Sequence, residues 1–438
     1  MKKATCLTIA GSDSGGGAGV QADLKTFASL GVHGVSVITS VTAQNTRKVE
    51  ATLDLPLDFI KKQIDSLHKD FRIGAAKTGM LANEEIIKLV AESIGEYPLV
   101  VDPVMVATSG DRLQAAEAVD ALKRYLLPGA TLVTPNIYEA EMLSGIRIRT
   151  IEDVKEAALA ISEFTGAVVV KGGHLNGTDV LYYNGRFYEF SAEYYPGKYH
   201  GSGCTYSAAI AAFLARGFEL TDAVKKAKEY ITWSIRGAYS PGKGAKVLNH
   251  MFLKEREAER YSVLSDLEAA LAKVVNLPGF QTLIPEVGIN FVYSLPCPEN
   301  LEDVAGIKGR IVNAGGRALV AGCVDFGASK HVARVLLAAS SKDRNIRSAM
   351  NIRYSKEMLN AVKSAGLSTA SFSRDEEPPG VSTMEWGTLK AIESQGSVPD
   401  VIYDEGAIGK EPMIRILGRN PQEVISKVKK IIKKLPVE

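Results

Sequence analysis

The chain has 438 residues, a length that predicts two or three domains. Its hydrophobic content of 46% and charged content of 23% are typical of globular proteins, and a net charge of +2 provides no general attraction to nucleic acid or membranes. No apolar run is long enough to span a membrane, and residues 6–10 are too short for a signal peptide. The four cysteines lack metal-type spacing. We therefore expect a soluble, cytoplasmic protein without structural disulfides.

Strands and helices alternate in the first half of the chain. Short apolar runs predict strands at 3–10, 35–39, 99–101, 131–134 and 167–171. Helical spacing predicts helices at 20–30, 56–70, 83–94, 137–143, 151–164 and 224–237. Asn83 is a suitable N-cap for the third of these helices. This order predicts a parallel sheet covered by helices on both faces.

Polar residues follow several of these strands. In a parallel sheet, ligands bind beyond the carboxyl ends of the strands. The polar residues at these ends are Asp13, Asp102, Asn136, Glu139 and Lys171. A lone carboxylate there is often merely solvated. However, two carboxylates and a lysine suit a site for ATP and Mg²⁺, in which the carboxylates hold the ion and the lysine neutralises phosphate.

Two glycine-rich segments lie in the same half. The spacing in Gly11–Gly19 does not match a dinucleotide fingerprint, so we interpret it as a loop that lets backbone approach a small substrate. The run His200-Gly-Ser-Gly-Cys204 opens a buried helix. Its glycines expose backbone N–H groups at a positive helix end, which predicts an anion hole formed by Gly201, Ser202 and Gly203. The alternative is an ordinary junction between a loop and a helix.

These motifs resemble, in the same order, the hydroxymethylpyrimidine/phosphomethylpyrimidine kinases of thiamine biosynthesis. The resemblance spans about residues 1–250 and rests on seven runs: 7–27, 37–46, Lys77–Met80, Asp102–Met105, Thr134–Asn136, Lys171–His174 and His200–Cys204. It implies a ribokinase-like α/β fold, with a central, mostly parallel sheet flanked by helices. It also implies ATP- and Mg²⁺-dependent phosphorylation of hydroxymethylpyrimidine to the monophosphate and then to the diphosphate.

The family's site residues carry over to matching positions. Gln44 is implied to recognise the pyrimidine, with Gly11, Asp23, Met80 and Val104 lining the same pocket. Cys204 stands where relatives that act on sugars have an aspartate base. A helix N-terminus can lower a thiol pKa from its usual ~8.5, so a thiolate base is reasonable. The alternative for Cys204 is a small buried apolar residue. A pyridoxal or sugar kinase is the rival activity, and Gln44 and Cys204 argue against it.

The second half predicts a separate α/β domain. A charged segment at 253–275 is helical in period and is interpreted as a connecting helix between domains at 1–252 and 276–438. Strands are predicted at 287–293, 309–312, 318–323, 350–354, 367–371, 401–403 and 414–417. Helices are predicted at 330–339, 356–365, 384–395 and 421–434.

Basic and polar residues mark a second candidate site. They are Arg310, Lys330, His331, Arg334, Arg353 and Lys410. Several cations beside glycine-rich turns suit a diphosphate and a monophosphate held together. A lone histidine such as His331 is more often structural.

The segment from about residue 265 to 438 resembles the archaeal-type thiamine-phosphate synthase domain, whose fold is similar to class II aldolases. The matching runs are Val287–Asn290, Gly309-Arg310, Phe326–Arg334, Asn351–Tyr354 and Asp404–Pro412. The resemblance implies coupling of the pyrimidine diphosphate with thiazole phosphate to thiamine phosphate and diphosphate.

In that family Arg310 and His331 match critical residues, which we assign to stabilising the leaving diphosphate. Asn351, Arg353 and Lys410 are candidates for binding substrate phosphates. One histidine cannot form a zinc cluster, so no zinc is expected. The alternative is a non-catalytic domain that senses thiamine phosphates. We expect a homo-oligomer whose partners are small molecules, namely hydroxymethylpyrimidine, ATP and thiazole phosphate, with no nucleic acid or membrane partner.

Overall fold

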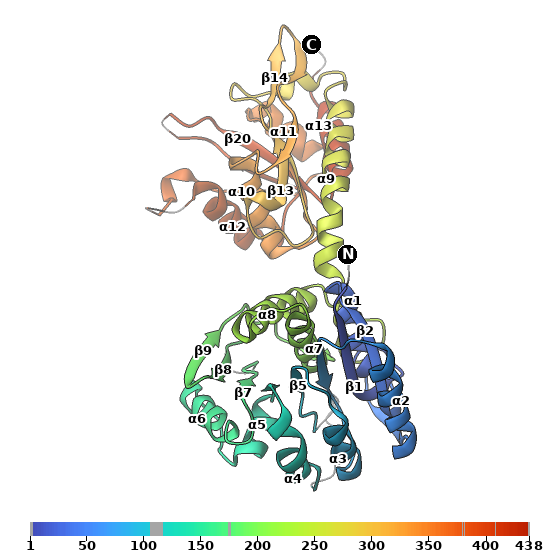
Figure 1. Ribbon diagram of the computed structural model, residues 1–438. Helices are drawn as coiled ribbons and strands as arrows, with labels where there is room; N and C mark the ends of the chain where they lie inside the picture. Colours follow the sequence, from blue (N-terminus) through green and yellow to red (C-terminus); the bar gives the residue numbers. More distant parts are fainter. Residues whose placement is uncertain are drawn as a thin grey trace. The chain divides into compact units, whose positions relative to one another are not determined.

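The computed structural model describes residues 3–105, 117–173, 177–378, 380, 382–407 and 409–436. The chain divides into two compact units, Met1–Lys254 and Glu255–Glu438 (Figure 1). His174, the last residue of one motif singled out above, lies outside the described residues.

The first unit is built on a large sheet. In the described residues its order is β3-β2-β1-β4-β5-β6-β7-β8-β9. The strands are β1 (Thr5–Asp13), β2 (His33–Gln44), β3 (Val49–Asp54), β4 (Ala75–Thr78), β5 (Leu99–Val101), β6 (Leu132–Val133), β7 (Ala167–Val170), β8 (Asp179–Tyr183) and β9 (Arg186–Phe190). The central strands pair in parallel in the order β2-β1-β4-β5-β6-β7, and β3, β8 and β9 are antiparallel additions at the edges. The prediction of a mostly parallel sheet is confirmed.

Helices cover both faces of this sheet. They are α1 (Gly19–Ser29), α2 (Leu57–Asp70), α3 (Glu84–Ser93), α4 (Glu117–Ala121), α5 (Ile137–Ser144), α6 (Ile151–Ile161), α7 (Ser202–Ala215) and α8 (Leu220–Arg236). Alternate residues of a strand face opposite sides. Val168 and Val170 of β7 pack into the cluster under α2, α3, α5 and α6, whereas Val169 packs into the cluster under α1, α7 and α8. Asn83 caps α3 by accepting the Ile86 N–H at 3.0 Å, as predicted.

Two of the strands that the sequence did not predict, β3 and β4, have a weak pattern. Strand β3 is almost wholly exposed, so it lacks the alternation of a half-buried strand. Strand β4 is a four-residue Ala-Ala-Lys-Thr segment, which is short and only partly apolar. A further small ladder, β10 (Tyr199–His200) with β11 (Lys246–Val247), leads directly into α7.

The second unit has its own sheet, with order β16-β13-β12-β17-β20-β19-β18 in the described residues. The strands are β12 (Phe291–Ser294), β13 (Val304–Ile307), β16 (Val324–Phe326), β17 (Ser348–Arg353), β18 (Thr369–Ser371), β19 (Val401–Asp404) and β20 (Met413–Gly418). Only the β18–β19 pair is parallel among these strands. Strands β14 (Ile311–Ala314) and β15 (Arg317–Val320) form a separate hairpin.

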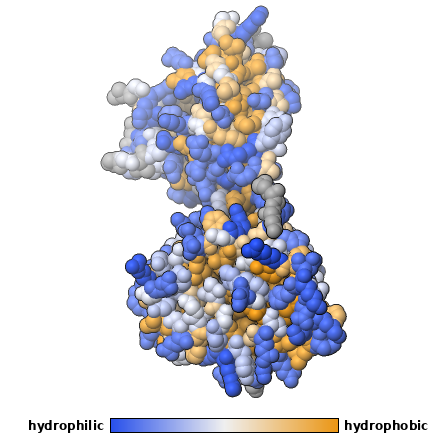
Figure 2. Space-filling model, in the orientation of Figure 1, coloured by the Kyte–Doolittle hydropathy of each residue, from blue (hydrophilic) through white to orange (hydrophobic). Residues whose placement is uncertain are grey.

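Five helices accompany this sheet in the described residues. They are α9 (Phe252–Val274), α10 (His331–Lys342), α11 (Lys356–Ser364), α12 (Thr383–Gln395) and α13 (Pro421–Ile432). The segment interpreted as a connecting helix forms α9, and from Val263 onward its apolar side chains belong to the core of the second unit. Hydrophilic and hydrophobic residues are mixed on the visible surface of each unit (Figure 2). Within the described ranges, no helix has the length and apolar character needed to cross a bilayer.

Candidate active sites

The first unit contains a cavity of about 940 Å³ beyond the carboxyl ends of the parallel strands. Its wall includes twelve of the residues predicted for the kinase site: Gly11, Gln44, Met80, Asp102, Val104, Asn136, Glu139, Lys171, Gly201, Ser202, Gly203 and Cys204. These residues come from seven separate segments of the chain, so their convergence is a property of the fold. Asp23 is the one predicted residue that does not line the cavity.

The predicted anion hole is the start of helix α7. Gly201 is the N-cap with a φ of +81°, and no side chain caps the helix. A Cβ atom on Gly201 would lie 1.8 Å from the carbonyl oxygen of Gly17, so glycine is required there. The first N–H groups of a helix have no partner within the helix. The turn therefore presents donors to the cavity at the positive end of a buried helix.

Asp102 and Lys171 form an ion pair at the same end of the cavity. Lys171 Nζ lies 2.9 Å from Asp102 Oδ1, and the Ser207 hydroxyl donates to Asp102 Oδ2 at 3.2 Å. Burial opposes ionisation of Asp102, but the Lys171 and Lys77 ammonium groups outweigh it and hold its pKa below the ordinary value. Burial also opposes the charge on Lys171, yet Asp102 and Glu139 keep its pKa raised. Both groups are therefore charged at neutral pH.

Glu139 has a structural bond as well as a place on the cavity wall. It forms the capping box of α5: Asn136 Oδ1 accepts the Glu139 N–H at 2.9 Å, and Glu139 Oε2 accepts the Asn136 N–H at 2.8 Å. Burial raises the Glu139 pKa to about 7, with the Lys171 charge opposing the rise. Asn136 and Glu139 thus shape the wall, and Glu139 changes charge near neutral pH.

Cys204 lies at the cavity wall and is partly exposed. Burial raises its pKa to about 11, because the Lys77 charge that favours the thiolate is opposed by Asp23 and Asp102. The sequence left the ionisation state of Cys204 open, and the structure favours the neutral thiol over the thiolate. Desolvation and two nearby carboxylates outweigh the helix end, and the thiol is neutral at pH 7.

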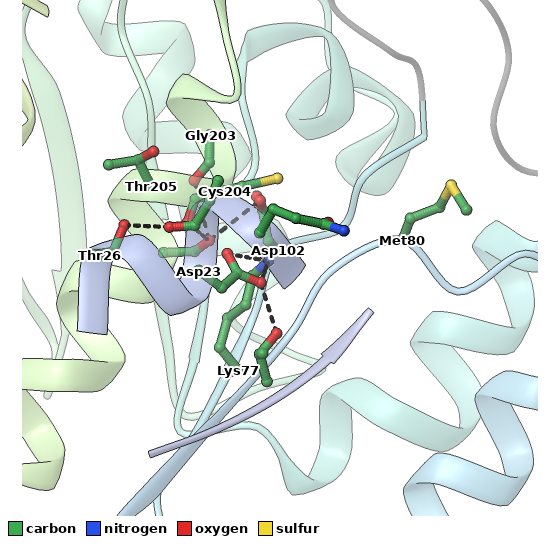
Figure 3. A network of polar contacts seen from close by, with 12 residues as sticks. Asp23, Thr26, Lys77, Met80, Asp102, Gly203, Cys204 and Thr205 are labelled. Atoms are coloured by element: carbon green, nitrogen blue, oxygen red, sulfur yellow. Dashed lines mark hydrogen bonds and ion pairs between the residues drawn. The ribbon is translucent and has the colours of Figure 1, made fainter. Parts of the chain in front are cut away.

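Asp23 requires a second correction. Its side chain is fully buried, 2.9 Å from the Lys77 ammonium and 2.6 Å from the Thr8 hydroxyl. Figure 3 shows Asp23 of α1 facing Lys77 of β4, with Cys204 at the start of α7 close to both. Lys77 lines the cavity and Asp23 does not, because Asp23 lies behind the wall as the counter-ion of Lys77. Asp23 therefore holds Lys77 in place from behind the wall and does not line the cavity as predicted.

Breaking this buried pair should destabilise the first unit. Lys77→Met leaves the Asp23 carboxylate buried without its partner, which should cost about 3–5 kcal/mol of unfolding free energy. The double variant Lys77→Met/Asp23→Leu should recover most of that loss. Each unit has one tryptophan, Trp233 and Trp386, so urea unfolding in a Trp386→Phe background reports the first unit alone. An unchanged midpoint in Lys77→Met would contradict the pairing.

The second unit gathers cations around His331. His331 is the first residue of α10, and its pKa is lowered by partial burial and by the positive charges of Arg310, Arg334, Arg415 and Arg374. The structure thus brings Arg310 and His331 into one electrostatic neighbourhood. Arg310 also donates to the Val287 carbonyl.

Asp404, which the sequence analysis did not single out, anchors two of these arginines. Its carboxylate is fully buried at the end of β19. It accepts from Arg374 at 2.6 and 3.2 Å and lies 2.7 Å from Arg415 Nη1. One carboxylate offsets only part of the positive charge around His331, so this cluster suits an anion.

The three candidate phosphate ligands of this unit have different surroundings. Asn351 is buried, and its side chain accepts the Asn290 N–H at 2.7 Å and donates to the Gly288 carbonyl at 3.1 Å. It is therefore committed to holding the turn before β12. Arg353 is exposed, and Lys410 is an exposed lysine 3.6 Å from Glu377 Oε2.

Within the described ranges, no group of three or more His, Cys, Asp or Glu side chains could hold a metal ion. Mg²⁺ is usually held by one or two carboxylates together with substrate phosphates. Asp102 and Glu139 on the cavity wall fit that requirement.

Comparisons with known proteins cover both units. Residues 13–249 match the model of the phosphomethylpyrimidine kinase family, and residues 266–430 match that of the thiamine-phosphate synthase ThiN. A bifunctional thiamine biosynthesis protein of Methanocaldococcus jannaschii is 38% identical over 98% of each chain. A hydroxymethylpyrimidine/phosphomethylpyrimidine kinase of Haemophilus influenzae is 46% identical over 56% of this chain and 95% of its own.

The first unit has the ribokinase-like fold of solved kinase structures. The pyridoxal kinase of Staphylococcus aureus in complex with AMP-PCP and pyridoxal is 35% identical, with a TM-score of 0.53 over 57% of this chain and 95% of its own. Together with the family matches, these relatives account for both units. The chain therefore belongs to the phosphomethylpyrimidine kinase family and, over its whole length, to the family of bifunctional thiamine biosynthesis proteins.

Proposed function

We propose that this chain carries two consecutive activities of thiamine biosynthesis. The first unit phosphorylates hydroxymethylpyrimidine with ATP, first to the monophosphate and then to the diphosphate. The second unit couples the diphosphate with thiazole phosphate to thiamine phosphate and releases diphosphate. The observation that best supports the kinase activity is that Gln44, Lys171 and the α7 anion hole line the same cavity. We assign the kinase to residues 1–252 and the synthase to 276–438, joined by the helical segment 253–275.

Charge and position dominate the proposed kinase step. Phosphoryl transfer passes through a loose transition state, so the protein mainly aligns the reactants and stabilises charge on the transferred group. Lys171 and the N–H groups of Gly201–Cys204 hold the transferred phosphate, while Gln44 pairs with the pyrimidine ring. The substrate hydroxyl attacks the terminal phosphorus of ATP, the bond to the leaving ADP oxygen breaks, and the hydroxyl proton passes to a base. Cys204 can be that base only in its thiolate form.

The nucleotide and its ion fit the remaining wall. The pyridoxal kinase complex with AMP-PCP supports use of ATP in this fold. Ile231 and Ile235 of α8 offer apolar contacts to a nucleoside at the same cavity. Asp102 and Glu139 would hold Mg²⁺, directly or through water. When bound, the ion offsets negative charge on the phosphates.

The proposed synthase step requires stabilisation of a leaving diphosphate. The bond between the pyrimidine methylene carbon and the diphosphate oxygen breaks, and the thiazole nitrogen bonds to that carbon. We assign Arg310 and His331, within the larger cation cluster, to stabilising the charge on the departing group, which their shared electrostatic neighbourhood supports. Arg353 and Lys410 remain candidates for the thiazole phosphate, whereas Asn351 acts through the backbone turn that it holds.

One experiment tests the whole proposal. The full chain is incubated with hydroxymethylpyrimidine, ATP, Mg²⁺ and thiazole phosphate, and the products are separated over time. The mono- and diphosphates should appear in sequence, followed by thiamine phosphate and inorganic diphosphate. Accumulation of the pyrimidine diphosphate with binding but no coupling would favour the sensor alternative for the second unit. Phosphorylation of pyridoxal in place of the pyrimidine would favour the rival kinase. The homo-oligomeric state and the cytoplasmic location stay predictions.

Gln44→Ala should weaken pyrimidine binding and spare the chemical step. Losing its hydrogen bonds to the ring should raise KM for hydroxymethylpyrimidine about tenfold or more, with kcat within about threefold of the parent. Steady-state kinetics at saturating ATP measures both constants. Gln395→Ala is the matched control, because Gln395 is an exposed glutamine of α12 in the second unit and does not line the cavity. An unchanged KM in Gln44→Ala would remove Gln44 from pyrimidine recognition.

A further inference from the structure

His200 connects the glycine-rich loop, the anion hole and Gln44. It is a buried residue of β10, directly before Gly201. Its Nε2 atom lies 2.9 Å from Asp13 Oδ2 and 3.4 Å from Gln44 Nε2. A Cβ atom on Gly17 would lie 2.2 Å from the imidazole Cδ2, so the loop packs directly against the ring. The imidazole is therefore fixed in position from two sides.

Asp13 is a rigid and charged anchor for this ring. Its carboxylate accepts the N–H groups of Gly15, Gly17 and Ala18 at 2.8–2.9 Å. Burial opposes its charge, but the His200 hydrogen bond and the loop amides hold its pKa below the ordinary value. An ionised carboxylate only accepts hydrogen bonds, so His200 Nε2 must carry a proton that it donates to Asp13. That single Nε2 proton is directed at Asp13, so Nε2 has no lone pair with which to accept a hydrogen bond from Gln44.

This donor limits how the Gln44 amide can sit. The two ends of a side-chain amide have the same size, so hydrogen bonding decides which end faces which neighbour. With the nitrogen toward His200, the 3.4 Å contact joins two donors and is not a hydrogen bond. With the oxygen toward His200, the amide meets the positive N–H edge of the ring as a weaker second acceptor beside Asp13.

Thr42, the other neighbour of the Gln44 amide, is compatible with the amide oxygen facing His200. The Thr42 hydroxyl lies 3.1 Å from the Gln44 amide and 3.0 Å from the Ser12 carbonyl. Its single proton can go to Ser12, which leaves the Thr42 oxygen as an acceptor for the Gln44 NH₂ group. Thr42 and His200 then use one donor and one acceptor of the amide. One donor and one acceptor remain, in a fixed order, for a ligand.

We propose that His200, held by Asp13, is a positioning residue that fixes the donor–acceptor order of the Gln44 amide and thereby selects a ring with the complementary order. This inference rests on the proposed kinase function. Hydroxymethylpyrimidine offers an amino donor beside a ring-nitrogen acceptor. Its 4-oxo analogue offers the reverse, a carbonyl acceptor beside a ring N–H. A fixed amide pairs with the first and opposes the second, whereas a freely rotating amide pairs with both.

The test compares kcat/KM for the 4-amino and 4-oxo substrates in the full chain. The ratio of the two constants does not depend on the fraction of active enzyme, so partial unfolding of a variant cancels. His200→Gln places an N–H near the Nε2 position, and His200→Asn places one only near Nδ1. The wild type should prefer the 4-amino substrate, and His200→Asn should narrow that preference at least about tenfold. His200→Gln should keep most of it, and KM for ATP should stay within about twofold in both variants.

Each outcome either supports or overturns the positioning role of His200. An unchanged ratio in His200→Asn, equal loss in Asn and Gln variants, or a wild type that phosphorylates both rings equally overturns the positioning role while the kinase stands. A wild type inactive on the 4-amino substrate overturns the proposed kinase itself. Thr42→Val removes the other anchor of the amide without altering His200 and should also narrow the ratio. It decides the question if the His200 variants fail to fold.

Discussion

Replacing Cys204 with alanine is expected to lower kcat of the kinase about 10²-fold while leaving KM for hydroxymethylpyrimidine nearly unchanged. Cys204 lies at the cavity wall beside the anion hole, so its loss removes a proton acceptor without removing a contact to the ring edge. The remaining rate comes from Lys171 and the α7 amides, which stabilise charge without moving a proton. Cys323→Ala is the matched control, because Cys323 is an exposed thiol of the second unit.

The pH dependence of the kinase reaction is a second test of Cys204 as the base. The pKa of Cys204 is raised to about 11, and the proposed base is its thiolate, so the ionised fraction of this base grows throughout the neutral range as pH rises. Wild-type kcat should therefore increase between pH 6 and pH 9, and the Cys204→Ala profile should be flatter. Unchanged turnover in Cys204→Ala would remove Cys204 as the base. A flat wild-type profile would assign the proton to another acceptor, such as the phosphate itself.

Replacing either Arg310 or His331 with alanine should lower the rate of coupling about 10²- to 10³-fold and leave the kinase within about twofold of the parent. Both residues belong to the cation cluster of the second unit, and the kinase cavity is lined by residues of the first unit alone. The substrates are the pyrimidine diphosphate and thiazole phosphate, and release of inorganic diphosphate is the measurement.

A surface arginine separates the role of Arg310 from a general loss of charge. Arg317 on the β14–β15 hairpin is exposed and is not one of the four arginines whose charges lower the His331 pKa most. Arg317→Ala should keep full coupling activity. Loss of both kinase and synthase activities in Arg310→Ala or His331→Ala would indicate misfolding, and full coupling in both variants would leave the sensor alternative for the second unit.

Local sequence motifs predicted most of the residues that line the kinase site. Short apolar runs that end in polar residues placed Asp102, Asn136 and Lys171 at strand ends, and the parallel sheet then brings such ends to one edge. The two glycines before Cys204 predicted a helix start that faces a ligand, and the φ of +81° at Gly201 explains why that residue must be glycine. These features depend on a few neighbouring residues, so the sequence contains them directly.

Local sequence motifs could not predict contacts between residues that are far apart in the chain. Asp23 and Lys77 are 54 residues apart, and Asp13 and His200 are 187 residues apart. No spacing rule pairs them, because the fold alone determines which strand and which helix meet. In the second unit, likewise, the link between Arg374 and Asp404 spans 30 residues and becomes visible only when β19 and the segment after β18 lie together.

The sequence by itself determined most of the helices, several of the central strands, the segments that line the kinase cavity and the family to which both halves belong, since these follow from local periodicity and contiguous motifs. Only the tertiary structure decided the charge state of Cys204, the place of Asp23 behind the cavity wall and the partners of His200 and Asp404. The physical reason is that burial and the sum of nearby charges set a pKa or an ion pair, and both depend on groups that are close in space and far apart in the chain.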